Sequence, residues 1–398
     1  MSTTLFDLPE NRVKLLPFTY TRPVCEIRVG ILTIREKWEK VLDEDCQVLT
    51  DPYLESKYPQ PELQVGDLLI NSIFCPNASL VKAIKALNDG EALFSSETLI
   101  ACKLSESTDF QNLSGFIKKQ FDESATVIER PWHIFQSNGE QIKSDFSLIT
   151  AGRKSAPLDD PHTTIYNPSN VFLEEGATVR AAIINATDGP VYLGKNSQVH
   201  EGSIIKGPFA LGEASHVNMG AKMKGDNTIG PHCKVGGEVS NSVFFGYSNK
   251  GHDGFLGNSV IGEWCNLGAD TNSSNLKNNY STVKVWDYET SKLENTGLQF
   301  CGLLMGDHSK AGINTMFNTG TVVGVSANVF GADFPPKFIP SFAWGGSSGF
   351  VTFRKEKSFE MCEAVMKRRK IDLSLGDKAI LSEIMEKSAS YRTWEEEK

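Results

Sequence analysis

The sequence predicts an α/β domain over residues 1–150, a parallel β-helix over residues 171–345 and a helical tail over residues 346–398. Two observations lead to this fold class. Strand-like and helix-like segments alternate in the first part, and an aliphatic residue recurs at every sixth position in the second. Residues 151–170, which include the stretch AGRKSAPLDDPHTT, are expected to be a linker.

The front domain shows the alternation in three consecutive segments. Residues 31–42, ILTIREKWEKVL, have apolar side chains spaced for one face of a helix. Residues 65–74, VGDLLINSIF, contain a buried strand by composition, and residues 77–87, NASLVKAIKAL, are expected to form the helix that follows. This order is typical of a sheet covered by helices.

The β-helix is predicted from a ladder of period six. Eight aliphatic residues follow one another at this spacing, namely Leu193, Val199, Ile205, Leu211, Val217, Met223, Ile229 and Val235. The register then slips by two residues, and the ladder is expected to resume at Phe255, Ile261 and Leu267, and again at Met305, Ala311, Phe317, Val323 and Val329. A sandwich of ordinary strands is the alternative, but strand alternation has period two.

Such a ladder has a simple physical meaning. Each hexapeptide forms one short face, three faces close one coil, and the aliphatic side chain points inward onto its equivalents in neighbouring coils. Gly follows several ladder residues, as in LGKNSQ and VGGEVS, and Gly and Asn tolerate the positive φ of a tight corner. The tail from Ser358 carries Phe359, Cys362, Val365 and Met366 on one helical face, followed by the basic cluster KRRK.

Charge and cysteine usage exclude several classes of protein. The net charge of −9 argues against a nucleic-acid or anionic-membrane binder, although a few local cations can still hold a small anion. No signal-like core opens the chain and no apolar run is long enough to span a bilayer, which predicts a cytoplasmic protein. The eight Cys lack any C-x-x-C pair, so we expect reduced core thiols and no metal site.

The hexapeptide ladder resembles the left-handed β-helix of the hexapeptide-repeat acyltransferases, over roughly residues 171–340. Those proteins are typically trimers with active sites in clefts between neighbouring prisms. The resemblance therefore implies a homotrimer, with loops at the register slips carrying the chemistry.

Around His252 the resemblance narrows to bifunctional sugar-1-phosphate nucleotidyltransferase/acetyltransferases. The matching residues are His252, Phe255, the segment Asn266-Leu267-Gly268-Ala269 and the pair Asn275-Leu276. The resemblance implies acyl transfer from acetyl-CoA, or another acyl-CoA, to the amine of an amino-sugar-1-phosphate. It implies His252 as general base, Asn266 and Asn275 as substrate contacts, and Lys224 and Lys284 as partners of the phosphate or the developing oxyanion.

The chemistry agrees with these residue types. An amino sugar is largely protonated at neutral pH, and an imidazole can take the proton as the amine attacks a thioester. Three departures leave the sugar, the acyl group and the nucleotide open. Phe255 stands where the family has Tyr, Lys224 lacks the bidentate fork of the family's Arg, and no basic residue occurs at Asn241-Ser242.

The opening of the chain resembles sugar nucleotidyltransferases in the segment LLPFTYTRPVCEIRVGILTIREKW. Arg12, Arg22 and Arg28 are the candidate phosphate contacts. The Gly-rich phosphate loop is missing, Val24 replaces the sugar-phosphate Lys, and Asn71-Ser72 occurs where a metal-binding Asp is expected. Mg²⁺ would be needed only if this domain were active, and we expect a divergent, poor nucleotidyltransferase.

Two alternatives stay open from the sequence. The chain could be an active nucleotidyltransferase whose β-helix serves as a trimerising scaffold, or a non-catalytic regulator that binds a sugar nucleotide. In the favoured interpretation the partners are a sugar phosphate and a CoA thioester, with neither nucleic acid nor membrane involved.

Overall fold

A computed structural model describes residues 2–110 and 112–395. By its internal contacts the chain forms two compact units. The first comprises residues 1–15, 21–27 and 32–130, and the second comprises residues 16–20, 28–31 and 131–398. Residues 131–150, which the sequence assigned to the front domain, are thus grouped with the second unit.

The first unit is a six-stranded mixed sheet with helices, in the strand order β2-β1-β3-β5-β4-β6. Strands β1, β2 and β3 are parallel, and β5 is antiparallel to β3. Its elements are β1 (Thr3–Phe6), α1 (Pro9–Lys14), α2 (Ile34–Leu42), β2 (Cys46–Leu49), β3 (Leu68–Asn71), α3 (Ala78–Lys85), β4 (Glu91–Ser95), β5 (Thr98–Lys103) and β6 (Ile117–Gln120). The three segments predicted as helix, strand and helix are confirmed as α2, β3 and α3.

Local sequence explains why α2 begins at Ile34. Thr33 accepts the backbone N–H of Glu36, and the Glu36 side chain accepts the backbone N–H of Thr33. This reciprocal capping box satisfies two N–H groups that the first helical turn leaves free. Trp38 on the inner face of the helix is fully buried, so the helix packs against the core.

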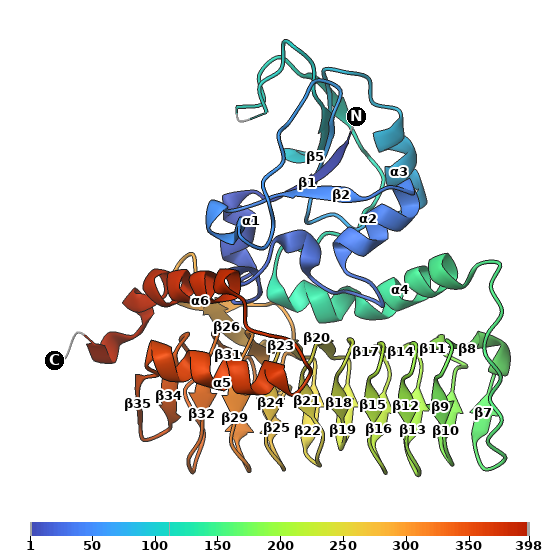
Figure 1. Cartoon of the computed structure of the whole chain (residues 1–398), viewed down its shortest axis with the longest axis vertical. Coiled ribbons are helices and arrows are strands. Elements are labelled where there is room, and N and C mark those ends of the chain that lie inside the picture. The colour runs from blue at the N-terminus through green and yellow to red at the C-terminus, as the bar shows by residue number, and fades with distance from the viewer. Residues whose placement is uncertain (1, 111, 396–398) are drawn as a thin grey trace. The chain divides into compact units, whose positions relative to one another are not determined.

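The second unit is a parallel β-helix with three faces, seen in Figure 1 as a row of stacked short strands. The first face contains β7 (Thr164–Tyr166), β10 (Ile183–Asn185), β13 (Ile204–Lys206), β16 (Lys222–Lys224), β19 (Glu238–Ser240), β22 (Phe255–Gly257), β25 (Asn272–Ser273) and β30 (Met316–Phe317). The second face contains β8 (Val171–Leu173), β11 (Val191–Leu193), β14 (Phe209–Leu211), β17 (Asn227–Ile229), β20 (Val243–Gly246), β23 (Val260–Glu263), β28 (Leu304–Met305), β31 (Val322–Val323) and β33 (Phe338–Ile339). The third face contains β9 (Thr178–Val179), β12 (Gln198–Val199), β15 (His216–Val217), β18 (Lys234–Val235), β21 (Asn249–Lys250), β24 (Asn266–Leu267), β29 (Lys310–Ala311), β32 (Asn328–Val329), β34 (Ala343–Gly346) and β35 (Gly349–Thr352).

The predicted ladder lines the interior of this β-helix. All eight residues from Leu193 to Val235 are buried, and Leu211 pairs with Ile229 in one column of the second face. The later stretch from Met305 to Val329 is buried as predicted. The core is therefore a stack of aliphatic layers, in which each coil covers the apolar surface of the next.

One part of the predicted register is wrong. The inward position after the slip belongs to Leu256, which pairs with Val239, whereas Phe255 is only half-buried. The inward series between Val235 and Ile261 runs through Val239, Phe244, Lys250 and Leu256. Shortened coils break the six-residue count here, so the count from Val235 missed these residues.

Three helices and a hairpin complete the second unit. Helix α4 (Pro131–Thr150) contacts β14, β17, β20 and β23 of the second face, and Asn138 on α4 accepts the hydroxyl proton of Thr228. The hairpin of β26 (Lys284–Asp287) and β27 (Lys292–Asn295) leaves the β-helix between β25 and β28. The tail forms α5 (Lys355–Lys367) and α6 (Leu375–Lys387), with Cys362 and Met366 of α5 buried.

These observations confirm the predicted fold class, an α/β domain followed by a left-handed parallel β-helix and a helical tail. All eight Cys are buried free thiols, as expected. None of the helices in the described part of the chain has the length and hydrophobicity that a bilayer crossing requires.

Candidate functional site

A shortened corner of the β-helix creates a groove. Regular corners between the third and first faces take six residues, as from Val199 to Ile205 and from Val217 to Met223. From Val235 to Val239 the chain takes only four. The missing residues leave a hollow of about 760 Å³ beside the next coil.

Two glycines form the shortened corner because nothing larger fits. A Cβ on Gly236 would lie 2.5 Å from the carbonyl oxygen of Gly251. Gly237 has a φ of +68°, and a Cβ there would lie 2.6 Å from the carbonyl oxygen of Gly254. The coil that carries residues 251–254 is thus in backbone contact with the shortened corner.

His252 lies on this groove. It is exposed on the turn between β21 and β22, and it lines the hollow together with His200, Asn218, Met219, Gly236, Gly237, Gly251, Asp253, Ala269 and Asp270. Within the part of the chain that the structure describes, no side chain is hydrogen-bonded to its imidazole ring. An exposed imidazole at the rim of a hollow is free to exchange a proton with a bound molecule.

The turn that carries His252 is held at three successive carbonyl groups. Asn218 donates its side-chain amide to the carbonyl oxygen of Gly251 at 2.7 Å. The ammonium of Lys250 donates to the carbonyl oxygens of His252 and Asp253 at 2.8 and 3.1 Å. His252 therefore sits on a restrained backbone, which is the condition for a precisely positioned functional group.

Lys250 is an unusual residue in this core. It occupies an inward position that is aliphatic in neighbouring coils, pairs with Val235, and is 1% exposed. Burial lowers the pKa of its ammonium to about 8, against the weaker effect of the Asp253 and Asp270 carboxylates. A cation inside an apolar prism is costly unless its donors are satisfied, and here two carbonyl oxygens accept them.

The other predicted acyltransferase residues lie outside the groove lining of the single chain. Lys224 is exposed at the end of β16 and pairs with Glu238 at 2.9 Å. Asn266 is exposed on the third face, on β24. Asn275 donates to the side chain of Asn258 at 2.8 Å, and Lys284 is exposed on the hairpin strand β26. One chain does not bring these four residues together with His252.

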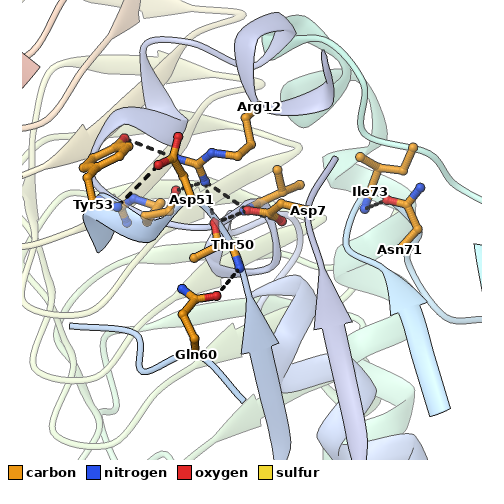
Figure 2. Close-up of polar contacts among 10 residues, drawn as sticks. Asp7, Arg12, Thr50, Asp51, Tyr53, Gln60, Asn71 and Ile73 are labelled. Carbon is orange, nitrogen blue, oxygen red and sulfur yellow. Dashed lines mark hydrogen bonds and ion pairs between the residues drawn. The ribbon is translucent and has the colours of Figure 1, made fainter. Parts of the chain in front are cut away.

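In the first unit, the carboxyl ends of the parallel strands carry a closed polar cluster (Figure 2). Asp7 follows β1, and its fully buried carboxylate pairs with Arg12 at 2.9 Å. The same carboxylate accepts the Thr50 hydroxyl at 2.6 Å and the backbone N–H of Val24 at 3.1 Å. This edge is where open α/β sheets bind ligands, but the Asp7 carboxylate at the end of β1 is already paired with Arg12.

The remaining donors of Arg12 are also engaged. Its guanidinium donates to Thr50 at 2.8 Å, to the carbonyl oxygen of Arg22 at 3.2 Å and to the Tyr53 hydroxyl at 3.2 Å. Arg22 is buried in the same unit. Arg28 belongs to the second unit, where it donates to the carbonyl oxygens of Phe245 and Ile31. The three candidate phosphate contacts therefore divide between the two units.

The residues at the end of β3 do not fit a Mg²⁺ site. Asn71 is fully buried, and its amide donates to the carbonyl oxygen of Leu99 at 2.9 Å. Its oxygen accepts the backbone N–H of Ile73 at 3.3 Å (Figure 2). In residues 2–110 and 112–395 no three His, Cys, Asp or Glu side chains are grouped as metal ligands. Mg²⁺ prefers carboxylate oxygens, and Asp7 is taken by Arg12.

Sequence reasoning missed the supporting residues of the groove. Asn218, Asp253 and Asp270 line it, and Lys250 lies beneath it. The adjacent pair Gly236-Gly237 was the available signal, because two glycines between the inward residues Val235 and Val239 mark a shortened corner. Lys250 could have been found by counting inward positions back from Leu256.

Two comparisons find known proteins with similar sequences. Residues 3–154 match the family model described as sugar nucleotidyl transferase. Over 87 residues the chain is 34% identical to the bifunctional protein GlmU of Methanocaldococcus jannaschii. That stretch covers 22% of this chain and 21% of the relative, so the chain spans about a fifth of the length of the curated relative that it matches.

Two solved structures are loosely similar. One is the polySia-specific acetyltransferase NeuO, with 16% identity and a TM-score of 0.28 over 49% of this chain and 85% of that chain. The other is the Arabidopsis UDP-N-acetylglucosamine acyltransferase, with 15% identity and a TM-score of 0.24 over 58% of this chain and 90% of that chain.

The family model and the GlmU relative confirm the predicted resemblance to bifunctional sugar-1-phosphate nucleotidyltransferase/acetyltransferases. The enzyme class that they support is a transferase.

Proposed function

We propose that this protein transfers an acyl group from acetyl-CoA, or another CoA thioester, to the amine of an amino-sugar-1-phosphate. The observation that carries the proposal is the exposed His252 on a restrained turn at the rim of the hollow. The resemblance of the surrounding motif to acetyltransferases supplies the reaction class.

The proposed reaction needs one proton acceptor. The amine nitrogen attacks the thioester carbonyl carbon, a C–N bond forms and the C–S bond breaks. His252 takes the proton from the nitrogen and returns it to the leaving CoA sulfur. A positioned general base of this kind contributes roughly 10²–10⁴-fold in rate.

The proposal includes a homotrimer. Within one chain the groove lining holds two carboxylates, Asp253 and Asp270, and no Lys or Arg among the residues that the structure describes. A phosphorylated acceptor needs cations. Lys224 and Lys284 would then reach the substrate from a neighbouring subunit, together with Asn266 and Asn275.

The test is thiol release from acetyl-CoA with glucosamine-1-phosphate and galactosamine-1-phosphate as acceptors, and glucosamine as the unphosphorylated comparison. We expect His252→Ala to lower kcat by about 10²–10⁴-fold while the fold and the affinity for acetyl-CoA stay nearly unchanged. An active parent whose His252→Ala variant keeps the full rate would contradict the role of His252. Sedimentation at micromolar concentration tests the trimer, which a stable monomer contradicts.

The family match of residues 3–154 supports a second candidate, an active sugar nucleotidyltransferase. The Asp7–Arg12 pair and the engaged amide of Asn71 argue against it, because triphosphate chemistry needs free cations and metal-binding carboxylates. We therefore propose that the front domain is a divergent member with little or no nucleotidyl transfer.

A further inference from the structure

We propose that Lys250 is a positioning residue for His252, holding the turn that presents the imidazole from inside the β-helix. The inference rests on the proposed function. Lys250 is not among the residues that line the groove, and in the proposed reaction it does not touch the reacting atoms; it acts through the backbone of His252.

The hydrogen bonds of the regular corners show why the turn needs such a residue. The residues of a corner are counted from the inward residue that precedes it. At a regular corner the third residue donates its backbone N–H to the carbonyl oxygen of the second corner residue in the preceding coil. Gly202 donates to Ala181 at 2.9 Å, Gly220 to Glu201 at 3.0 Å and Asn314 to Ala269 at 2.8 Å. Each corner is thereby tied to the next.

The turn at His252 breaks this pattern by one residue. Asp270 donates its N–H to the carbonyl oxygen of Asp253, at 3.1 Å, instead of to that of His252. In the described residues no backbone N–H outside the strands is bonded to the carbonyl oxygen of His252. The Lys250 ammonium donates to the carbonyl oxygen of His252 instead, at 2.8 Å.

The location of Lys250 makes a purely stabilising role a poor explanation. Its neighbours in the same column, Val235 and Leu267, are aliphatic and buried. Placing an ammonium among them costs free energy that an aliphatic residue would not. A buried polar group that is retained at such a cost often specifies one local conformation, and here the conformation is that of the turn carrying the base.

The charge of Lys250 predicts that kcat depends on pH. The ammonium faces the carboxylates of Asp253 and Asp270 and, through the backbone, the His252 turn. Because its pKa is lowered to about 8, it loses its charge within the working range of an enzyme. We expect kcat of the parent to fall above about pH 8, as the Lys250 ammonium loses its proton.

The experiment compares Lys250→Met with Leu267→Met, a matched exchange at the inward position one coil later. In Lys250→Met we expect kcat to fall by roughly 10- to 100-fold, as small misplacements of a catalytic group do, and the fall above pH 8 to disappear. The KM for acetyl-CoA should change little. Lys250→Gln, which keeps an N–H donor, should lie between the parent and Lys250→Met, and Leu267→Met should behave like the parent.

Two further measurements separate positioning from general stability. Amide hydrogen exchange at residues 251–254 should be faster in Lys250→Met and unchanged in Leu267→Met. In a His252→Ala background Lys250→Met should cause no further loss of rate, because it acts through the missing base. Parent-like kcat and exchange in Lys250→Met, or a full additional loss in the His252→Ala background, would overturn the proposal.

Failure of the proposed function gives a different result. If the parent releases no thiol with any of the three acceptors, the acyltransferase proposal fails and the catalytic part of the Lys250 proposal fails with it. The exchange comparison needs no activity, so it still decides whether Lys250 holds the turn.

Discussion

The side-chain amide of Asn218 is bonded to the carbonyl oxygen of Gly251 at 2.7 Å, across a corner that is two residues short. In a regular β-helix the intervening corner would occupy this space. The bond joins the coil above the shortened corner directly to the turn of His252. One amide thus ties the two walls of the groove together.

We expect Asn218→Ala to weaken both stability and catalysis. Loss of this bond should lower the free energy of unfolding by about 1 kcal/mol and reduce kcat several-fold by loosening the His252 turn. Gln198→Ala, on the same face one coil earlier and outside the groove lining, is the matched control. Thermal unfolding and thiol release measure the two effects, and equal behaviour of the two variants contradicts the role of Asn218.

The buried charge of Lys250 predicts a pH-dependent gain in stability on its removal. The folded pKa of about 8 lies below the ordinary value of 10.5, so below pH 8 the folded chain carries a charge that burial disfavours. Between about pH 8 and 10 the folded state releases this proton while the unfolded state keeps it. The free energy of unfolding of the parent therefore rises with pH in this window.

Lys250→Met has no such dependence. We expect it to be more stable than the parent by about 1–2 kcal/mol at pH 7, after allowing for the lost bond to His252, and the difference should shrink towards pH 10. Thermal unfolding at both pH values, with Leu267→Met as control, provides the measurement. A Met variant that is less stable at pH 7 would mean that the ammonium stabilises the folded core.

The aliphatic ladder makes the firmest structural prediction. Ile229 is fully buried in a column with Leu211, so Ile229→Asp places an unpaired charge in the prism and should cost several kcal/mol or prevent folding. Ile204 is 47% exposed on an outward position, and Ile204→Asp should fold normally. A parent-like unfolding temperature for Ile229→Asp is the result that would contradict the ladder.

The repeat made the β-helix predictable, because inward positions keep a fixed spacing wherever the coils are complete. The six-residue spacing no longer locates the inward residues where the coils are shortened. Between Val235 and Leu256 the corners lose residues and one inward position is a Lys, so periodicity placed Phe255 in the core and missed Lys250. The motif around His252 singled out this residue, but Asn218 and Lys250, which hold its turn, depend on contacts between coils that no local pattern encodes.

The front domain shows the same limit. Missing glycines predicted a poor phosphate site, while Arg12 remained a candidate ligand residue because its sequence neighbours do not reveal Asp7 as its partner. Asp7 follows β1 and Arg12 lies in α1, and the pairing of β1 with β2 adds Thr50, which is bonded to both. The sequence alone therefore identified Arg12 as a cation but did not show that Asp7 neutralises it.

The Asp7–Arg12 pair carries the last prediction, which concerns nucleotidyl transfer. The Asp7 carboxylate is fully buried, and the Arg12 guanidinium donates hydrogen bonds to Asp7, Thr50 and Tyr53. Neither group is free to bind a triphosphate or a metal ion, so pyrophosphate exchange with UTP, dTTP or CTP should be weak or absent.

We expect Arg12→Met to unfold the first unit, because it leaves a buried carboxylate unpaired at a cost of about 3–5 kcal/mol. Lys14→Met, at a half-buried position of the same helix, serves as the control for the loss of a nearby cation. Robust turnover by the parent with any of the three nucleotides, abolished in a stably folded Arg12→Met variant, would establish Arg12 as a phosphate ligand and the front domain as an active nucleotidyltransferase.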